Sequence, residues 1–480
     1  MEERQTLFQY VYGSLKEQIQ TGRLEYGEAL PSITRLCGYY QVGIRTIRDV
    51  LQALQAEGLI RSQPRKATYA CYRPPDSLAD NPALQEAVRN RRFILEAYET
   101  AALLMPPAFA LCLSNGGARK KLEAFSIPPP GKKAGRKEQL AASVLLYSLL
   151  QGSGNRLLAG LYSALETYMF LPSEGEETVN LSLPLTSALR RLVQYPAASS
   201  GEAQARLEGG VRRQIPLADS ILSRWAARYP IPSQAEAIPF RWIPSPEESL
   251  RYRQIAGELV NQIGSGEFPS GSLLPSEAAL AARYGVSAAT IRKALARLNE
   301  SGFARTVNGV GTRAGFPDKA HRRACMKKSP YMQEAILYLS ALQLMALFAR
   351  PAAQLAWSRM DSAVIEAISR ESEDSAAGFP LPILFRHLTA CIPLQPFRCI
   401  LEELGRRTSW GRYFARFDPQ GIVQSPVYQK SKEAFRCLQA GNVSGFAGQW
   451  AACYAQCFQT AREEAIQCGL SEAKLLTLPR

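Results

Sequence analysis

The chain has 480 residues, which suggests roughly three or four domains, and its 46% of hydrophobic residues allow it to bury substantial cores. A formal net charge of +15 favours a polyanionic partner, although charge alone does not separate nucleic acid from a membrane surface. The ten cysteines form no CxxC pair or compact framework, which fits a reduced, cytosolic compartment better than a disulfide-bonded one.

Neither the start of the chain nor its most apolar stretch predicts a membrane segment. The first ten residues, MEERQTLFQY, are charged and lack the apolar core of a signal peptide. The run AILYLSALQLMALFA at 335–349 stops at Arg350 and Pro351 and is shorter than the ~20 residues that a membrane span needs. It therefore predicts a buried helix, and we expect no membrane partner.

Two segments of the chain repeat each other at a shift of 244 positions without a gap, and roughly a third of about sixty positions are identical. The clearest matches are LPS at 30–32 with LPS at 274–276, and TIR at 46–48 with TIR at 290–292. Each copy precedes about 160 residues rich in Ala and Leu with helical spacing. The stretch 228–249 between the halves carries five prolines and is typical of a linker.

These patterns predict five parts in chain order and a mainly α fold with internal duplication. They are a winged helix at 1–75, a helical domain at 80–235, a linker at 236–249, a second winged helix at 250–316 and a second helical domain at 322–480.

The second copy has the clearer local signals. Apolar residues at Ile255, Leu259 and Ile263 are spaced by four and form one helical face. Ser276 and Ser287 are suitable N-caps for two further helices, the second of them at 288–300. Gly285 and Gly302 supply stops after these helices, and Asn308-Gly309 indicates a β-hairpin. The order of these elements predicts a winged helix-turn-helix, whose third helix enters the major groove of DNA.

This stretch, LPSEAALAARYGVSAATIRKALARLNESGF followed by NGVGT, resembles the DNA-binding domain of the GntR family of bacterial transcription regulators. The resemblance covers about 65 residues, and the first copy resembles the same domain more faintly. It implies that the chain is a cytoplasmic, nucleoid-associated bacterial regulator, for example a repressor. The competing interpretation is a helix-turn-helix that serves only for packing.

In the second copy the resemblance places the DNA contacts on two helix starts and the wing. Arg292 is suited to guanine O6 and N7 or to a phosphate. The candidates are Ser276, Ser287, Thr290, Arg292, Lys293, Asn308, Gly309 and Arg313. The chain departs from the family at Ala278 and Ala288, near positions where relatives often carry arginine, so we expect different or sparser base contacts.

The first copy keeps part of this set. Its third helix has Arg45, Thr46 and Arg48, and its wing lacks the paired glycines of the second wing but gains the charges of Arg65 and Lys66. The added positive charge predicts that the first copy binds DNA more through phosphate contacts than through base contacts.

The helical regions weakly resemble the all-helical sensor of the FadR-type branch, with a generic helical bundle as the alternative. The segment LQGSGNRLLAGLYSALE at 150–166 looks like the matching SGN segment of the first half. Sensors of that type often bind a metal through one Asp and three His. The corresponding places of the second half hold Pro382, Arg386, Ser431 and Cys453, so we expect no metal and no cofactor.

The sequence gives expectations for three further side chains, two histidines and one arginine. Both histidines of the chain, His321 and His387, are expected to be surface or packing residues. Arg386 is a candidate contact for an anionic small-molecule effector whose identity the sequence does not give.

Two winged helices on one chain suggest a single-chain pseudo-dimer on double-stranded DNA, with an imperfect palindromic operator because the copies differ. A homodimer with four winged helices is the rival arrangement. A scaffold or antagonist that does not bind DNA is a second class of function. We expect no catalysis, because neither helical region is long enough for the aminotransferase domain that some GntR proteins carry, and P-loop, GxSxG and HExxH motifs are absent from the sequence.

Overall fold

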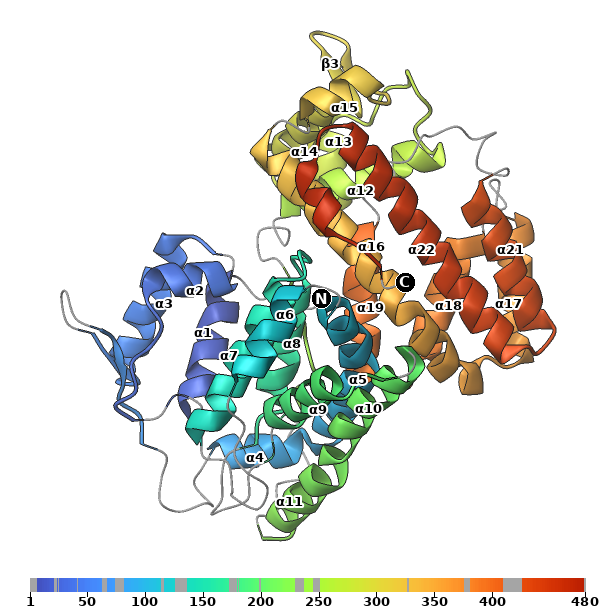
Figure 1. Cartoon of the computed structure of the whole chain (residues 1–480). Helices are drawn as coiled ribbons and strands as arrows, with labels where there is room; N and C mark the ends of the chain where they lie inside the picture. Colours follow the sequence, from blue (N-terminus) through green and yellow to red (C-terminus); the bar gives the residue numbers. More distant parts are fainter. Residues whose placement is uncertain are drawn as a thin grey trace. The chain divides into compact units, whose positions relative to one another are not determined.

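The computed structural model describes residues 7–20, 24, 26–40, 42–62, 67–73, 82–113, 116–125, 136–171, 179, 181–197, 200–228, 237–244, 251–325, 328–374, 380–408 and 425–478. Within this part the chain is mainly helical, with two small two-stranded sheets, as the sequence predicts (Figure 1). It divides into two compact units. The first is Met1–Pro106, Arg119–Tyr147 and Gly160–Glu247, and the second is Pro107–Ala118, Ser148–Ala159 and Glu248–Arg480.

This division differs from the five expected parts in one respect. Residues 107–118 and 148–159, which belong to the first half of the sequence, group with the second unit. The boundaries of the five parts remain predictions.

The first unit opens with a small domain, here called the first head, of three helices and a hairpin. Its elements are α1 (Leu7–Gln20), α2 (Ile33–Tyr40), α3 (Ile44–Ala56), β1 (Ile60–Arg61) and β2 (Tyr69–Ala70). Its core includes Val11, Leu15, Ile47 and Leu54, all at most 1% exposed, so α1 and α3 pack face to face. Burial of this apolar surface stabilises the head.

The other elements of the first unit are helices. They are α4 (Pro82–Arg89), α5 (Arg91–Leu113), α6 (Gly116–Ala124), α7 (Arg136–Gln151), α8 (Leu158–Tyr168), α9 (Ser182–Gln194), α10 (Ser200–Arg212) and α11 (Gln214–Arg228). The ends of α5, α6, α7 and α8 that fall in 107–118 and 148–159 are counted in the second unit. Neighbours in sequence pack together, α9 on α10 and α10 on α11, while α11 also packs on α4.

The second unit contains the second head, whose elements follow those of the first. They are α12 (Arg251–Ser265), α13 (Glu277–Tyr284), α14 (Ala288–Ser301), β3 (Ala304–Val307) and β4 (Gly311–Ala314), with α15 (Lys319–Cys325) after the hairpin. The predicted inward face of α12 is confirmed, because Ile255, Leu259 and Ile263 are at most 1% exposed. Ile291 and Leu298 of α14 are buried to the same degree.

The hairpins of the two heads share their register. Ile60 pairs with Ala70 in the first hairpin, and Ala304 pairs with Ala314 in the second, which is the same register shifted by 244. The isolated bridges Ala29↔Tyr69 and Leu273↔Arg313 keep the same shift. The gapless sequence repeat therefore corresponds to a structural repeat.

A helical bundle follows the second head. It consists of α16 (Ser329–Ala356), α17 (Ser362–Asp374), α18 (Pro380–Cys391), α19 (Gln395–Thr408), α21 (Pro426–Gln439) and α22 (Val443–Gln467), with 3-10 turns at Trp357–Arg359 and Ser471–Leu475. Helix α16 packs lengthwise on α22 and also contacts α18 and α19 (Figure 1).

Helix α16 contains the apolar run of the sequence and is long and apolar enough to cross a membrane. Of its most apolar 18-residue stretch, 78% is buried inside the protein. Leu339, Leu344 and Phe348 of this helix are fully buried. This is the burial of a core helix, in agreement with the sequence prediction.

Candidate nucleic-acid interface

The third helix of the second head, α14, begins at a tight turn whose geometry follows from two residues. Gly285 ends α13 at φ 60°, a left-handed conformation that favours glycine. Ser287 then caps α14, and its hydroxyl accepts the backbone N–H of Thr290 at 3.3 Å. The turn of residues 285–287 thus joins the two helices of a helix-turn-helix.

The side chains of α14 divide into a buried and an exposed face. Ile291, Ala294, Leu295 and Leu298 are buried against the head. The exposed residues of the first turns are Ser287, Ala288, Ala289, Arg292 and Lys293, while Thr290 is half-buried. The face that a DNA groove would meet is thus short, polar and positively charged.

The start of α13 lies beside this face. Ser276 caps α13 by accepting the N–H of Ala279 at 3.2 Å. The next residue, Glu277, forms an ion pair with Arg292 of α14, with 3.6 Å between Oε2 and Nε. Since both partners are about half exposed or more, the pair contributes little stability and leaves the guanidinium accessible to a stronger anion such as a phosphate.

The wing is fixed to the far end of α14. The side-chain Nδ2 of Asn299 donates to Thr306 Oγ1 at 2.7 Å, and its side-chain Oδ1 accepts the backbone N–H of Thr306 at 2.9 Å. At the tip Asn308, Gly309 and Val310 are exposed, and Gly309 adopts φ 77°. Arg313 is exposed but donates to the backbone oxygen of Gly271 at 2.9 Å, which ties it to its own head.

In the first head α3 presents the corresponding face. Arg45 and Arg48 are exposed and Thr46 is half-buried. The N-cap position holds Gly43, which provides no side-chain cap. The predicted wing residues Arg65 and Lys66 lie outside the described residues.

Sequence reasoning missed two residues of this face. Ile44 is 54% exposed at the start of α3, an unusual position for a large apolar side chain, and Asp49 is exposed one turn further on. Comparison at a shift of 244 would have found them, because Ala288 and Lys293 occupy these places in the second head. The two faces share only Arg48 and Arg292 among their exposed side chains.

The candidate effector contact, Arg386, lies on α18 with its side chain 65% exposed and forms an ion pair with Glu371 of α17. His387 Nε2 lies 3.2 Å from the other carboxylate oxygen of Glu371, and burial lowers the pKa of His387. A solvent-facing, paired arginine does not line a buried pocket, so this geometry gives no support to the predicted effector contact.

The other positions compared with the metal ligands of FadR-type sensors are not grouped as ligands. Ser431 and Cys453 are fully buried, whereas Pro382 is exposed. Among the described residues, no group of three or more His, Cys, Asp or Glu side chains is arranged to hold a metal ion.

Comparison with known proteins gives the heads a family. Residues 7–70 and 251–313 each match the model of the bacterial regulatory proteins of the gntR family. Both heads are GntR-type winged-helix domains. The matched segments coincide with α1 to β2 and with α12 to β4.

Similar curated proteins match over a head-sized segment. The mannosyl-D-glycerate transport/metabolism system repressor MngR of Escherichia coli is 44% identical over 61 residues, which are 13% of this chain and 25% of that protein. The HTH-type transcriptional regulator YdeL of Bacillus subtilis is 33% identical over 93 residues, 18% of this chain and 20% of that protein. The chain thus spans about a quarter or less of the length of these relatives.

Solved structures with local similarity include Streptococcus agalactiae GntR, at 16% identity with a TM-score of 0.21, covering 43% of this chain and 99% of that one. A GntR family regulator from Pseudomonas syringae has 18% identity and a TM-score of 0.16, covering 44% of this chain and 84% of that one.

Proposed function

We propose that this chain is a DNA-binding transcriptional regulator of the bacterial cytoplasm, whose two GntR-type heads read the two unlike halves of one operator. The observation that carries the proposal is the exposed face at the start of α3 and of α14. Each face holds an exposed arginine at the same place of its third helix, Arg48 on α3 and Arg292 on α14. An arginine there is suited to two parallel hydrogen bonds with guanine O6 and N7.

The difference between the faces supports an asymmetric operator. Ile44 provides an apolar contact for a thymine methyl group, while Ala288 at the same place in the second head is too short to reach as far. Asp49 accepts a hydrogen bond from cytosine N4, whereas Lys293 favours guanine or phosphate. Two such faces recognise different base sequences, so the operator is an imperfect palindrome.

Contacts between the two halves of the sequence support a single-chain pseudo-dimer. Asn155, from the SGN segment of the first half, donates to Gln343 of α16 at 2.7 Å and to the backbone oxygen of Ser340 at 3.0 Å. Both Asn155 and Gln343 are buried, so the segment is part of the core of the second unit. Linking the halves replaces a concentration-dependent association with an intramolecular one.

A small-molecule effector in a helical domain remains part of the proposal. Its support is the weak FadR-type resemblance of the helical regions and the burial of most of α16 in a bundle beside the second head. Arg386 is one candidate contact, although its ion pair with Glu371 argues for a surface role.

Selection of bound duplexes from random DNA tests the function. We expect one enriched sequence with two unlike half-sites whose centres lie about one helical turn, ~34 Å, apart. Sedimentation of the complex at micromolar concentration then distinguishes one chain per duplex from a dimer with four heads. Failure to enrich any sequence at low salt, where non-specific DNA binding is strongest, would favour the scaffold or antagonist instead.

A further inference from the structure

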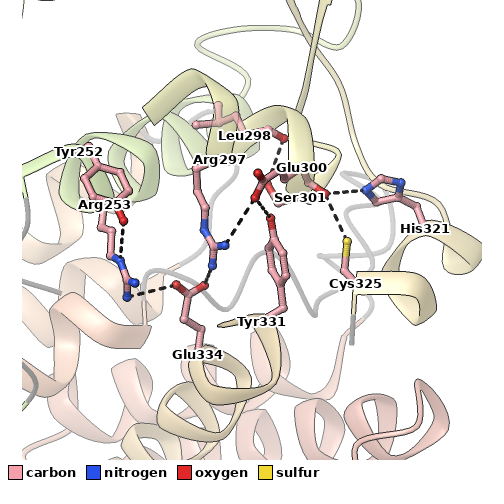
Figure 2. A network of polar contacts seen from close by, with 10 residues as sticks. All are labelled: Tyr252, Arg253, Arg297, Leu298, Glu300, Ser301, His321, Cys325, Tyr331 and Glu334. Carbon is pink, nitrogen blue, oxygen red and sulfur yellow. Dashed lines mark hydrogen bonds and ion pairs between the residues drawn. The ribbon is translucent and has the colours of Figure 1, made fainter. Parts of the chain in front are cut away.

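One carboxylate on α16 receives two arginines from the second head. Glu334 forms an ion pair with Arg297 of α14 and a second one with Arg253 of α12, the latter at 3.6 Å between Oε1 and Nη1 (Figure 2). The side chains of Arg297 and Glu334 are only 11% and 14% exposed. The DNA-facing helix is therefore tied through a largely desolvated ion pair to the first helix of the bundle.

Further contacts surround this ion pair. The guanidinium of Arg297 lies 4.0 Å from the ring centroid of Tyr331, one turn before Glu334 on α16. The Tyr331 hydroxyl donates to Glu300 Oε2 of α14 at 3.0 Å, and burial raises the pKa of Tyr331, so the hydroxyl stays protonated as a donor. Arg297 also lies 3.9 Å from Glu300 Oε2, so its guanidinium is held between an aromatic face and the carboxylates of Glu300 and Glu334 (Figure 2).

The C-terminal end of α14 is held as well. The backbone oxygen of Glu300 accepts the Cys325 thiol at 3.3 Å and lies 3.0 Å from His321 Nε2, both from α15 (Figure 2). A Cβ at Gly302 would come within 2.8 Å of the His321 ring, which shows how closely α15 covers this end of the helix. We call the set Arg253, Arg297, Glu300, His321, Cys325, Tyr331 and Glu334 the joint.

The first head cannot form the same joint. At a shift of 244, the places of Arg253, Arg297 and Glu300 are taken by Gln9, Ala53 and Ala56. The acidic residue at the end of α3, Glu57, instead pairs with Lys16 of α1 at 2.7 Å, inside the same head. The end of α3 is thereby fastened to its own domain, and the end of α14 to the bundle.

We propose that Glu334 is a positioning residue that sets the orientation in which the second head meets DNA, and that the first head is not held in this way. A buried ion pair with two arginines adopts one arrangement, because a displaced partner would leave an uncompensated charge in a desolvated place. The bundle thus determines how the Arg292 face is presented, and a movement of α16 displaces that face. The expected effect of Glu334 on DNA binding rests on the proposed function, whereas its role in holding the second head on α16 does not.

A double-mutant cycle in the full-length chain tests the inference. The variants are Glu334→Gln, Arg297→Gln and both together, with Glu371→Gln as the matched control, since Glu371 pairs with Arg386 on an exposed surface of the same unit. Hydrogen exchange measures the protection of backbone amides at 297–302 and 319–325. Affinity is measured for the selected two-site duplex and for a duplex that carries only the half-site of the second head.

We expect Glu334→Gln to lower protection in both segments and to weaken binding to the two-site duplex about tenfold, which corresponds to about 1.4 kcal/mol. The affinity for the duplex with only the half-site of the second head should change less than about twofold, because binding by one head alone does not require a fixed orientation relative to the other. The double variant should match the worse single variant, as coupled residues do, rather than show the product of both effects. The Glu371→Gln control should match the wild type in every measurement.

Unchanged protection and unchanged binding in Glu334→Gln would overturn the inference. Equal weakening on both duplexes would overturn it too, because it would show that Glu334 only stabilises the fold. If no duplex is enriched with the wild-type chain, the proposed function fails, yet the exchange measurement still decides whether Glu334 holds the head on α16.

Discussion

The side-chain amide of Asn155 donates a hydrogen bond to the side-chain oxygen of Gln343, 188 positions further along the chain, at 2.7 Å. The side-chain oxygen Oδ1 of Asn155 accepts the N–H groups of Leu157 and Leu158, which caps the start of α8. Gln343 in turn donates to the backbone oxygen of Thr477 at 2.6 Å. One buried amide therefore joins a helix cap of the first half to α16 and to the C-terminal region.

Replacement of Asn155 by Ala is expected to lower the free energy of unfolding by about 2–3 kcal/mol, because it removes a helix cap and takes the Asn155 donor from the buried side-chain oxygen of Gln343. Urea unfolding measures the change. Arg156→Ala is the control, since its ion pair with Glu472 is 62% and 46% exposed and is expected to contribute less than about 1 kcal/mol. Equal effects of the two substitutions would contradict the role given to Asn155.

Substitutions at the N-cap positions of α14 and α3 are expected to change stability in opposite directions. Ser287→Ala removes the hydroxyl that accepts the Thr290 N–H and should destabilise the second head by about 1 kcal/mol. Gly43→Ser should stabilise the first head by a few tenths of a kcal/mol, since Gly43 has φ −69° and an added Cβ meets nothing within 4 Å. Thermal unfolding of the full chain measures both changes, and destabilisation by Gly43→Ser would show that α3 starts differently.

Ile44 is expected to contribute to base recognition by the first head alone. Ile44→Ala should weaken binding to the selected duplex by about 1 kcal/mol or more when the contacted base is thymine, and much less when that thymine is replaced by uracil, which lacks the methyl group. The reciprocal substitution Ala288→Ile in the second head is the matched control. If Ile44→Ala weakens binding to random DNA equally, the side chain does not read a base.

Because two of its thiols are buried, the folded chain is expected to lose free energy of unfolding at high pH. Burial raises the pKa of Cys112 and of Cys453 to about 12. Because a thiol with a raised folded-state pKa favours folding only while it is protonated, its contribution is present below about pH 9 and is lost as the pH rises towards 12. Urea unfolding across this interval should show a steeper loss in the wild type than in a Cys112→Ala, Cys453→Ala variant.

The same thiols should resist alkylation at mildly alkaline pH in the folded chain and react in urea, because the thiolate is the reactive form. Mass spectrometry of the modified peptides measures this. Rapid modification of Cys453 in the native chain would show that the bundle opens around α22.

Much of the second head could be predicted because its signals are local. Caps and stops act within one turn of a helix, so Ser276, Gly285, Ser287 and Gly302 fixed the ends of α13 and α14, and the helix expected at 288–300 is found at Ala288–Ser301. The hairpin at Asn308-Gly309 follows in the same way from turn chemistry.

The joint and the placement of the SGN segment could not be predicted, because they depend on packing between distant segments. Nothing near Glu334 in the sequence indicates Arg253 and Arg297 as partners, and nothing near Asn155 indicates Gln343. The same limit applies to Arg386, whose partner Glu371 is brought to it by the packing of α17 on α18. Periodicity identifies a buried face but not what covers it.

Footprinting of the selected duplex with arginine variants of each head tests the central claim most directly. The account predicts two protected stretches about one helical turn apart, with Arg48→Ala erasing one stretch and Arg292→Ala erasing the other, each at about 1–3 kcal/mol. If both variants weaken the two stretches alike, or if the stretches have the same sequence, the heads do not divide the operator between them and the account is wrong.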